Sequence, residues 1–267
     1  MKPSFIIEKN NGILSIIKNN LFSGSAPSIF NTIPNDATKE PMFFGQGVNT
    51  SRFDTMKYPV LDEYTKKQLS LFWQPEEVEL TKDVADFANL KPHEQHIFTA
   101  NLRYQTLLDS IQGRGPMELL LPIVSIPEME PWLNVWSSFE STLHSRGYSY
   151  IIQTIYPNPE EVLGKIIVTD EIIERANAIA AVGDKLMYLN TLLRCSEFGI
   201  EVSNVGVDVN SDEFKRLHIK TLILYLFSIY LVESVRFYVS FSCSFAFAER
   251  SNSVMEGNAK IIKLIAR

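Results

Sequence analysis

The sequence predicts an all-α protein, and three observations support this fold class. From Tyr58 onward, apolar residues recur at helical spacing over long segments, and no run alternates apolar and polar residues as a half-buried strand would. Three acidic residues, Asp109, Glu140 and Glu233, lie inside separate apolar, helix-like runs. The composition, 45% hydrophobic and 21% charged, is typical of a soluble globular protein.

The chain divides into an N-terminal extension, residues 1–38, and a single domain, residues 39–267. The extension is rich in Asn, Gly, Ser and Pro, which favour turns and irregular structure, with one candidate amphipathic helix at 13–17. An acid at Glu8 and the absence of arginine are atypical of transit peptides. We therefore expect a peripheral arm.

Six helical segments are expected in the domain, near 58–71, 92–112, 130–156, 170–193, 212–248 and 254–267. Breaks are expected at 113–116, 122–127, 157–159 and 199–210, where Gly and Pro gather. The stretch from Gly199 to Val209 is rich in β-branched residues and is the one candidate for a small hairpin. The segment from Val254 should be helical, with no Gly or Pro stop signal after it.

The apolar run from Leu222 to Val232 raises the alternative of a membrane span. The run is eleven residues long and is bracketed by Lys220, Glu233 and Arg236, whereas a span needs about 20 apolar residues. A short helix that is hydrophobic all round is typical of a bundle core. We therefore expect no membrane insertion.

Charge and cysteine content limit the partners and the compartment. The net charge of -6 and the absence of a basic cluster argue against direct nucleic-acid binding. Cys195 and Cys243 are far apart in a chain without a secretory signal, which indicates reduced thiols and a cytoplasmic location.

The segment from Glu140 to Tyr148 carries the most specific chemistry. Glu140, His144 and Tyr148 follow at four-residue intervals, so on a helix all three lie on one face. A carboxylate and an imidazole on an apolar face are costly unless they are paired. A hydrogen-bonded core pair is the simpler interpretation of Glu140 and His144 alone. If Glu140 and His144 converge with Asp109 and Glu233 on one cation, that cation pairs with all the buried charges. This is the arrangement in four-helix carboxylate bundles that bind iron or manganese.

The remaining polar and aromatic candidates are interpreted as structural. We expect His93, His96, Glu76, Glu77, Lys82 and Asp83 to lie on charged surfaces, and Tyr225, Tyr230 and Tyr238 to be packing aromatics. His218 precedes Glu233 by fifteen residues, or about 22 Å along a helix, too far to share a site.

Several strings, in order along the chain, resemble the small, radical-generating subunit of class I ribonucleotide reductase of the bacterial and phage type. They are Lys39–Gly45, Leu71–Val78, Tyr104–Arg114, His144–Tyr148, Glu233–Phe241, Cys243–Arg250 and Met255–Ile262. The resemblance implies a ferritin-like di-iron carboxylate bundle. It also implies a separate large subunit, which binds the ribonucleotide, and assembly of the small subunit as a homodimer. The expected location is the cytoplasm, which is that of the host if the chain is phage-encoded.

The resemblance also assigns roles to individual residues. The metal ligands of the family correspond to Asp109, Glu140, His144 and Glu233, with iron as the expected metal and manganese as the alternative. The radical-carrying tyrosine corresponds to Tyr148, and the electron-relaying tryptophan to Trp73. The apolar residues that shield the radical correspond to Phe237, Phe241 and Ile265.

Two departures from the family pattern affect these roles. The family spacing is Glu-x-x-His, whereas Glu140 and His144 have three residues between them, and Ser141 takes the position of the glutamate. A π-bulge would absorb the extra residue; otherwise Glu140 is rotated by about 100°.

The family also continues beyond Ile-Ala-Arg with Asp-Glu-x-x-His, which supplies the remaining ligands. We therefore expect a bundle that lacks its C-terminal helices and holds at most one well-ligated iron. We also expect no stable Tyr148 radical from the chain alone. The alternative to an active subunit is a truncated, inert remnant that needs a separately encoded C-terminal part.

Overall fold

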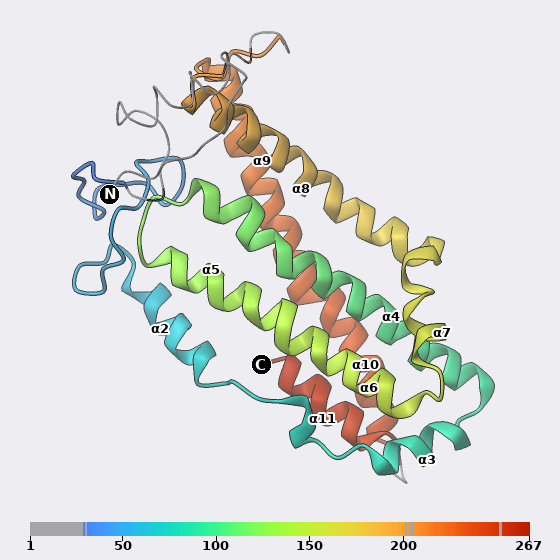
Figure 1. Cartoon of the computed structure of the whole chain (residues 1–267). Helices are drawn as coiled ribbons and strands as arrows, with labels where there is room; N and C mark the ends of the chain where they lie inside the picture. Colours follow the sequence, from blue (N-terminus) through green and yellow to red (C-terminus); the bar gives the residue numbers. More distant parts are fainter. Residues whose placement is uncertain (1–28, 30, 201, 203–205, 251–252) are drawn as a thin grey trace, which may run out of the picture.

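The described residues of this computed structural model form a helical bundle (Figure 1). They are residues 29, 31–200, 202, 206–250 and 253–267. Within them no strand is present, and the one β-type contact is an isolated bridge between Phe43 and Val124. The all-α prediction is confirmed. The candidate hairpin after Gly199 shows no strand in its described part, and the candidate helix at 13–17 lies outside the described residues.

Ten α-helices are present in the described part of the chain. They are α2 (Pro59–Leu69), α3 (Thr81–Asn89), α4 (Pro92–Gly115), α5 (Met129–Ser138), α6 (Ser145–Ile155), α7 (Pro159–Leu163), α8 (Asp170–Glu197), α9 (Asp212–Leu231), α10 (Phe237–Ala248) and α11 (Glu256–Ile265). Three π-helical turns, η2 (Pro116–Leu120), η4 (Phe139–His144) and η7 (Val232–Arg236), extend or join them. Short 3-10 turns are η1 (Pro75–Glu77), η3 (Leu121–Ile123) and η5 (Ile166–Val168).

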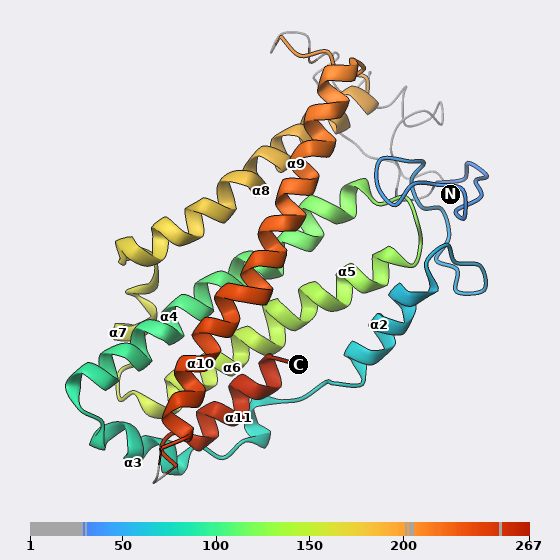
Figure 2. The same cartoon turned by 180° about the vertical axis from the view of Figure 1, so that it is seen from behind.

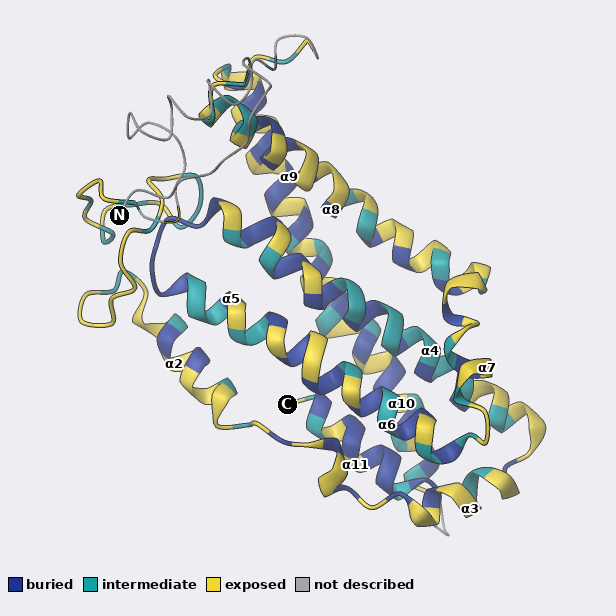
Figure 3. Ribbon diagram, in the orientation of Figure 1, coloured by how far each residue is buried: buried dark blue, intermediate teal, exposed yellow. Residues whose placement is uncertain are grey.

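Helix α4 lies at the centre of the bundle and contacts α5, α6, α8 and α10. The long rods α4, α5–η4–α6, α8 and α9–η7–α10 run alongside one another, and α11 lies against α10 and α6 (Figures 1 and 2). Their inward faces are buried (Figure 3). One buried cluster contains Trp73, Leu108, Tyr148 and Phe237, which come from segments far apart in the sequence.

Two local predictions were wrong. The chain does not break at 113–116, because α4 continues through Gly115 into the π-turn η2. Gly115 instead allows the Tyr225 side chain to pack closely against α4, since a Cβ at this position would lie 2.0 Å from the Tyr225 hydroxyl oxygen. Residues 81–89 form the unpredicted helix α3, and its Asp83 is buried, not part of a solvated face.

The rod from Asp212 to Ala248 is long and apolar enough to cross a membrane, with a mean hydropathy of 1.6 over its best window. One face of the rod, which includes Leu222, Tyr225 and Ile229, is buried in the bundle. Only 28% of that window is buried overall, because residues such as Phe227 are exposed. Core helices of soluble bundles have the same length and composition, so these two properties do not distinguish the alternatives.

Candidate metal centre

Asp109, Glu140 and His144 meet inside the bundle. One ligand atom from each lies within 4.8 Å of the other two, and all three side chains are buried. Asp109 comes from α4, and the other two residues come from η4. His144 Nδ1 lies 2.9 Å from Glu140 Oε2 and 3.6 Å from Asp109 Oδ2.

Glu233 comes from η7 and lines the same cavity of about 470 Å³ as these three residues. The Gln112 side-chain amide donates to Glu233 Oε1 at 2.8 Å and so helps to orient this carboxylate. Glu233 is not among the three mutually close groups. The structure therefore places three of the four expected ligands in direct proximity, and the fourth at the wall of their cavity.

The extra residue between Glu140 and His144 is accommodated by the π-helical turn η4, as one of the two alternatives predicted. Glu140 stays buried, while Ser141 is exposed and donates to the Ser137 carbonyl. The Ser145 hydroxyl donates to the Glu140 carbonyl at 2.9 Å. Glu233 also lies in a π-turn, and π-bulges in helices are frequent at functional sites.

Gly113 allows α4 and η4 to approach closely enough to form this cluster. A Cβ on Gly113 would lie 3.0 Å from the backbone nitrogen of Ser141. The Ser137 hydroxyl donates to the Gly113 carbonyl at the same contact. Since Asp109 lies one helical turn before Gly113, this contact sets the distance between Asp109 and Glu140.

The electrostatics of the cluster favour a bound cation. Burial, and then the Glu140 carboxylate, raise the pKa of Asp109 to about 7 and that of Glu233 to about 8. Burial lowers the pKa of His144, but the Glu140 and Asp109 carboxylates outweigh burial and raise it to about 10. Asp109 Oδ2 is buried without a hydrogen-bond partner among the described residues. Carboxylate oxygens and an imidazole therefore fit iron or manganese here.

Tyr148 is fully buried beside this cluster. Burial, and then the nearby Asp109 carboxylate, raise the pKa of Tyr148 well above its ordinary value. Its hydroxyl has no hydrogen-bond partner among the described residues. The phenol is therefore held neutral in a dry environment.

The other expected pocket residues, Trp73, Phe237, Phe241 and Ile265, belong to the same buried cluster as Tyr148. The buried rings of Phe237 and Phe241 stack with centroids 5.6 Å apart. Trp73 and Ile265 both approach Gly147, since a Cβ there would lie 3.0 Å from Trp73 Cη2 and 3.5 Å from Ile265 Cδ1. The indole nitrogen of Trp73 is buried without a hydrogen-bond partner among the described residues.

Residues 51–267 match the ribonucleotide reductase small-chain family. The chain belongs to this family. It is 49% identical over 243 residues to the ribonucleoside-diphosphate reductase 1 subunit beta of Salmonella typhimurium, covering 91% of this chain and 63% of the relative. It is 39% identical over 253 residues to the subunit beta of Enterobacteria phage T4, covering 90% of this chain and 63% of the relative. The chain thus spans less than two thirds of these small chains.

Solved structures show the fold of the family. The ribonucleotide reductase R2 subunit from Clostridium botulinum superposes with a TM-score of 0.71 at 22% identity, covering 90% of this chain and 66% of that one. The dimanganese(II) NrdF protein from Streptococcus sanguinis gives 0.63 at 18% identity, covering 82% and 65%. These likenesses agree with the ferritin-like prediction.

The other histidines and tyrosines considered from sequence are not among the three mutually close groups. His93 and His96 are exposed, whereas His218 is buried and its Nε2 lies 2.7 Å from Asn190 Oδ1. Tyr225 is a packing aromatic as expected, but Tyr230 and Tyr238 are 63% and 55% exposed. Sequence reasoning missed Gln112 and Gly113, whose contributions depend on helix–helix contacts.

Proposed function

We propose that this chain is the small subunit of ribonucleoside-diphosphate reductase and provides a tyrosyl radical for the reduction of ribonucleotides to deoxyribonucleotides. The observation that carries this proposal is the fully buried Tyr148 beside the clustered ligand atoms of Asp109, Glu140 and His144. Membership of the small-chain family supports it.

In this proposal Asp109, Glu140, His144 and Glu233 would hold metal, and the bound metal would supply the oxidising power. Tyr148 gives up one electron and its hydroxyl proton, and Asp109 is the carboxylate next to that hydroxyl. Phe237, Phe241 and Ile265 keep water away from the oxidised ring. Trp73 relays electrons through the buried cluster that it shares with Tyr148.

Iron is the proposed metal, with manganese as the alternative. Carboxylate oxygens and an imidazole nitrogen suit both ions, so the residues do not select between them. The Streptococcus sanguinis neighbour is described as a dimanganese(II) protein. Metal content after loading with each ion in turn distinguishes the two.

We further propose that additional polypeptide completes the centre. The buried Trp73 nitrogen and Asp109 Oδ2 have no hydrogen-bond partners in the described part of the chain. The cavity is also bordered by the exposed Tyr230 and Tyr238. The segment with Asp-Glu-x-x-His in the family carries the complementary groups: a second acid and histidine pair, and an aspartate for the tryptophan.

We propose that the chain works with a large subunit that binds the ribonucleotide, pairs with a second copy in a homodimer, and acts in the cytoplasm. Membership of the small-chain family supports the partnership with a large subunit. The competing proposal is that the 267-residue chain alone is an inert remnant. The buried Trp73 nitrogen, which has no hydrogen-bond partner in the described part of the chain, favours a requirement for further polypeptide.

The test is a tyrosyl-radical signal by electron paramagnetic resonance after iron and oxygen are added. We expect none from the 267-residue chain alone, and a signal once a polypeptide beginning with Asp-Glu-x-x-His is supplied. The signal should vanish in Tyr148→Phe. This control should fold normally, because it removes only the hydroxyl and leaves the fully buried ring in place. No signal in the complemented protein would refute the proposed function, whereas a Tyr148-dependent signal from the chain alone would refute the requirement for a partner.

A further inference from the structure

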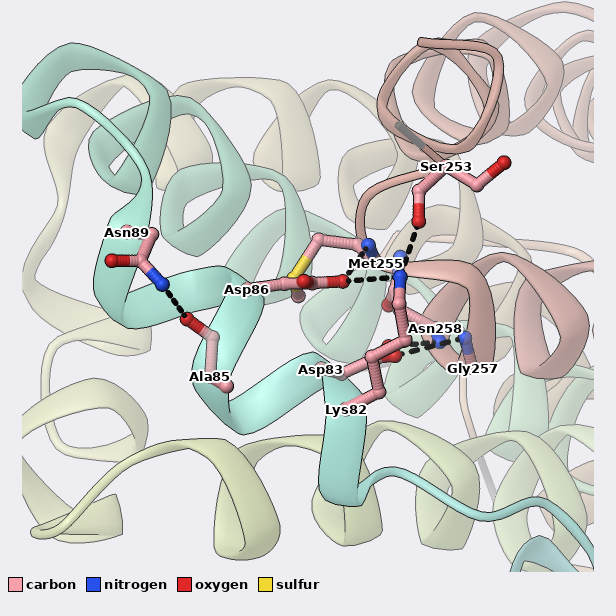
Figure 4. A network of polar contacts seen from close by, with 9 residues as sticks. All are labelled: Lys82, Asp83, Ala85, Asp86, Asn89, Ser253, Met255, Gly257 and Asn258. Atoms are coloured by element: carbon pink, nitrogen blue, oxygen red, sulfur yellow. Dashed lines mark hydrogen bonds and ion pairs between the residues drawn. The ribbon is translucent and has the colours of Figure 1, made fainter. Parts of the chain in front are cut away.

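Helix α11 is capped at its N-terminus by acidic side chains that belong to α3 (Figure 4). Asp83 accepts the backbone N–H of Gly257 at 3.0 Å and that of Asn258 at 2.5 Å, through its two different carboxylate oxygens. Asp86 accepts the N–H of Met255 at 2.9 Å. The first turn of a helix leaves its N–H groups without intrahelical partners. Since Met255, the N-cap of α11, provides no side-chain cap, α3 supplies the missing acceptors.

The turn before α11 has an unfavourable backbone conformation, and α3 contacts it there. Ser253 and Met255 have φ values of 46° and 61°, in the left-handed region that side chains other than glycine rarely adopt. Lys82 donates to the Ser253 carbonyl and pairs with Asp86 at 3.0 Å. Such conformations persist where surrounding contacts hold them. The α3 side chains therefore hold the start of α11 from both sides of the turn.

The junction between the two segments is tightly packed. A Cβ on Gly257 would lie 2.6 Å from Leu80 Cδ2 and 2.7 Å from the Glu79 carbonyl oxygen. Asp83 is only 1% exposed, so its two accepted N–H bonds are sheltered from water. Asp86 is partly exposed and has Lys82 as a second partner. Asp83 is therefore the main anchor.

The other end of α11 reaches the pocket around Tyr148. Ile261 and Ile265 lie one turn apart, and a Cβ on Gly147 would meet them at 3.3 Å and 3.5 Å. The same Cβ would lie 3.0 Å from Trp73 Cη2. The two isoleucines thus cover α6 at Gly147, which directly precedes Tyr148, and they lie next to Trp73 there. Because an α-helix is stiff over ten residues, the position of its first turn determines where Ile261 and Ile265 lie.

We propose that Asp83 is a positioning residue for the radical pocket: by capping α11 from α3, it holds Ile261 and Ile265 against Gly147, beside Trp73. The importance of the pocket for a radical rests on the proposed function. The effect of Asp83 on the solvent exposure of Trp73, through α11, is independent of the proposed function. It can be tested without metal.

The test uses the protein labelled with 5-fluorotryptophan and fluorine NMR. The Trp73 line is assigned by its loss in Trp73→Phe, and Trp132 and Trp136 serve as internal references. A water-soluble paramagnetic agent reports exposure. In Asp83→Asn, one oxygen is replaced by an NH₂ group that faces a backbone N–H. The open population seen at Trp73 should rise by about an order of magnitude, as expected from losing a helix-capping acceptor.

The matched control is Glu128→Gln. Glu128 is also a fully buried acid, and it accepts the N–H of Tyr58 at 2.8 Å at the start of α2. Like Asp83, Glu128 therefore caps a helix that is remote in sequence, and this helix is α2 rather than α11. A comparable loss of thermal stability with no change at Trp73 is expected in this variant. An equal rise in Trp73 exposure in both variants would mean that general loosening, and not α11, is responsible.

A second variant reaches the same junction without changing charge. Gly257→Ala forces the first turn of α11 away from Glu79 and should expose Trp73 as Asp83→Asn does. If Asp83→Asn does not fold, Gly257→Ala decides the matter. A folded variant of either kind with Trp73 as protected as before overturns the proposal.

The unaltered protein provides one further measurement. Hydrogen exchange of the Gly257 and Asn258 amides and of the Trp73 indole should report one common opening free energy, because all three groups are released together. Unequal values would overturn the proposal. A missing tyrosyl radical in the complemented protein would leave these results unchanged and would count against the proposed function alone.

Discussion

Glu140 and His144 face each other across one π-helical turn, with Oε2 2.9 Å from Nδ1, although one residue more than the family spacing separates them. In an α-helix this extra residue would turn Glu140 by about 100° relative to the residues after it. The wider turn absorbs the residue and keeps both side chains on the buried face. The insertion is thus compatible with a complete acid–histidine pair.

Deletion of Thr142 should therefore be tolerated. Thr142 is exposed within η4, and its removal restores the family spacing by converting the turn to regular α-helix. We expect an equal or higher midpoint of thermal unfolding, and binding of Mn²⁺ by calorimetry with unchanged affinity. In contrast, one added alanine after Thr142 should abolish binding, since a single bulge absorbs one residue. Loss of binding in the deletion would contradict this account.

The metal-free protein should lose stability as pH rises. The folded pKa values of Asp109 and Glu233, about 7 and about 8, lie above their ordinary values of 3.8 and 4.5. Between these limits the folded state binds more protons than the unfolded state, so stability falls with pH. The contribution of His144 is complete below its ordinary pKa of 6.5 and is lost as pH rises through about 10. Thermal unfolding from about pH 5 to about pH 9 without metal should show a continuous decline.

Metal should reverse this trend. Binding requires deprotonated carboxylates and a neutral imidazole, so protons are released and affinity rises with pH. The increase in unfolding temperature on adding Mn²⁺ should therefore be larger at about pH 8 than at about pH 6. A Mn²⁺ effect that is independent of pH would show that the cluster is not the binding site.

Gly113→Ala should weaken both folding and metal binding. The new Cβ would lie 3.0 Å from the Ser141 backbone nitrogen, which cannot move as a flexible side chain can. Separation of α4 from η4 should cost about 1–3 kcal/mol of unfolding free energy. Chemical denaturation and Mn²⁺ calorimetry measure the two effects. Gly47→Ala is the control, because its Cβ meets only Asn31 Nδ2 at 3.9 Å. Unaltered Mn²⁺ affinity in Gly113→Ala would refute the positional role of this contact.

Glu233→Gln should stabilise the metal-free protein and weaken its metal binding. The variant keeps an oxygen for the Gln112 amide but removes a carboxylate whose pKa burial and Glu140 raise to about 8. Above that pH the unfolding temperature should rise by roughly 2–4 °C, as about 1 kcal/mol gives in a chain of this size. Glu174→Gln, at an exposed position on α8, should change neither property. A lower unfolding temperature in Glu233→Gln would show that the carboxylate stabilises the metal-free fold.

The sequence alone determined the all-α class and most helix positions, because hydrophobic periodicity records which face of each segment is buried. The acids in apolar runs and the four-residue interval from Glu140 to His144 were also readable, since a buried charge requires a partner. Breaks at proline pairs were predicted correctly where the chain reverses, as at Pro157 to Pro159. Gly113 and Gly115 misled the prediction, because glycine marks a helix end and a close helix contact alike.

Only the tertiary structure decided how these elements combine. Whether Glu140 faced the cluster depended on η4 forming a π-turn against Gly113, a choice made by packing between distant segments. Asp83 looked like a surface charge in sequence, yet it is buried because the N-terminus of α11 folds onto it. Local sequence carries propensity and periodicity, whereas contacts between residues more than a hundred positions apart arise only when the bundle closes.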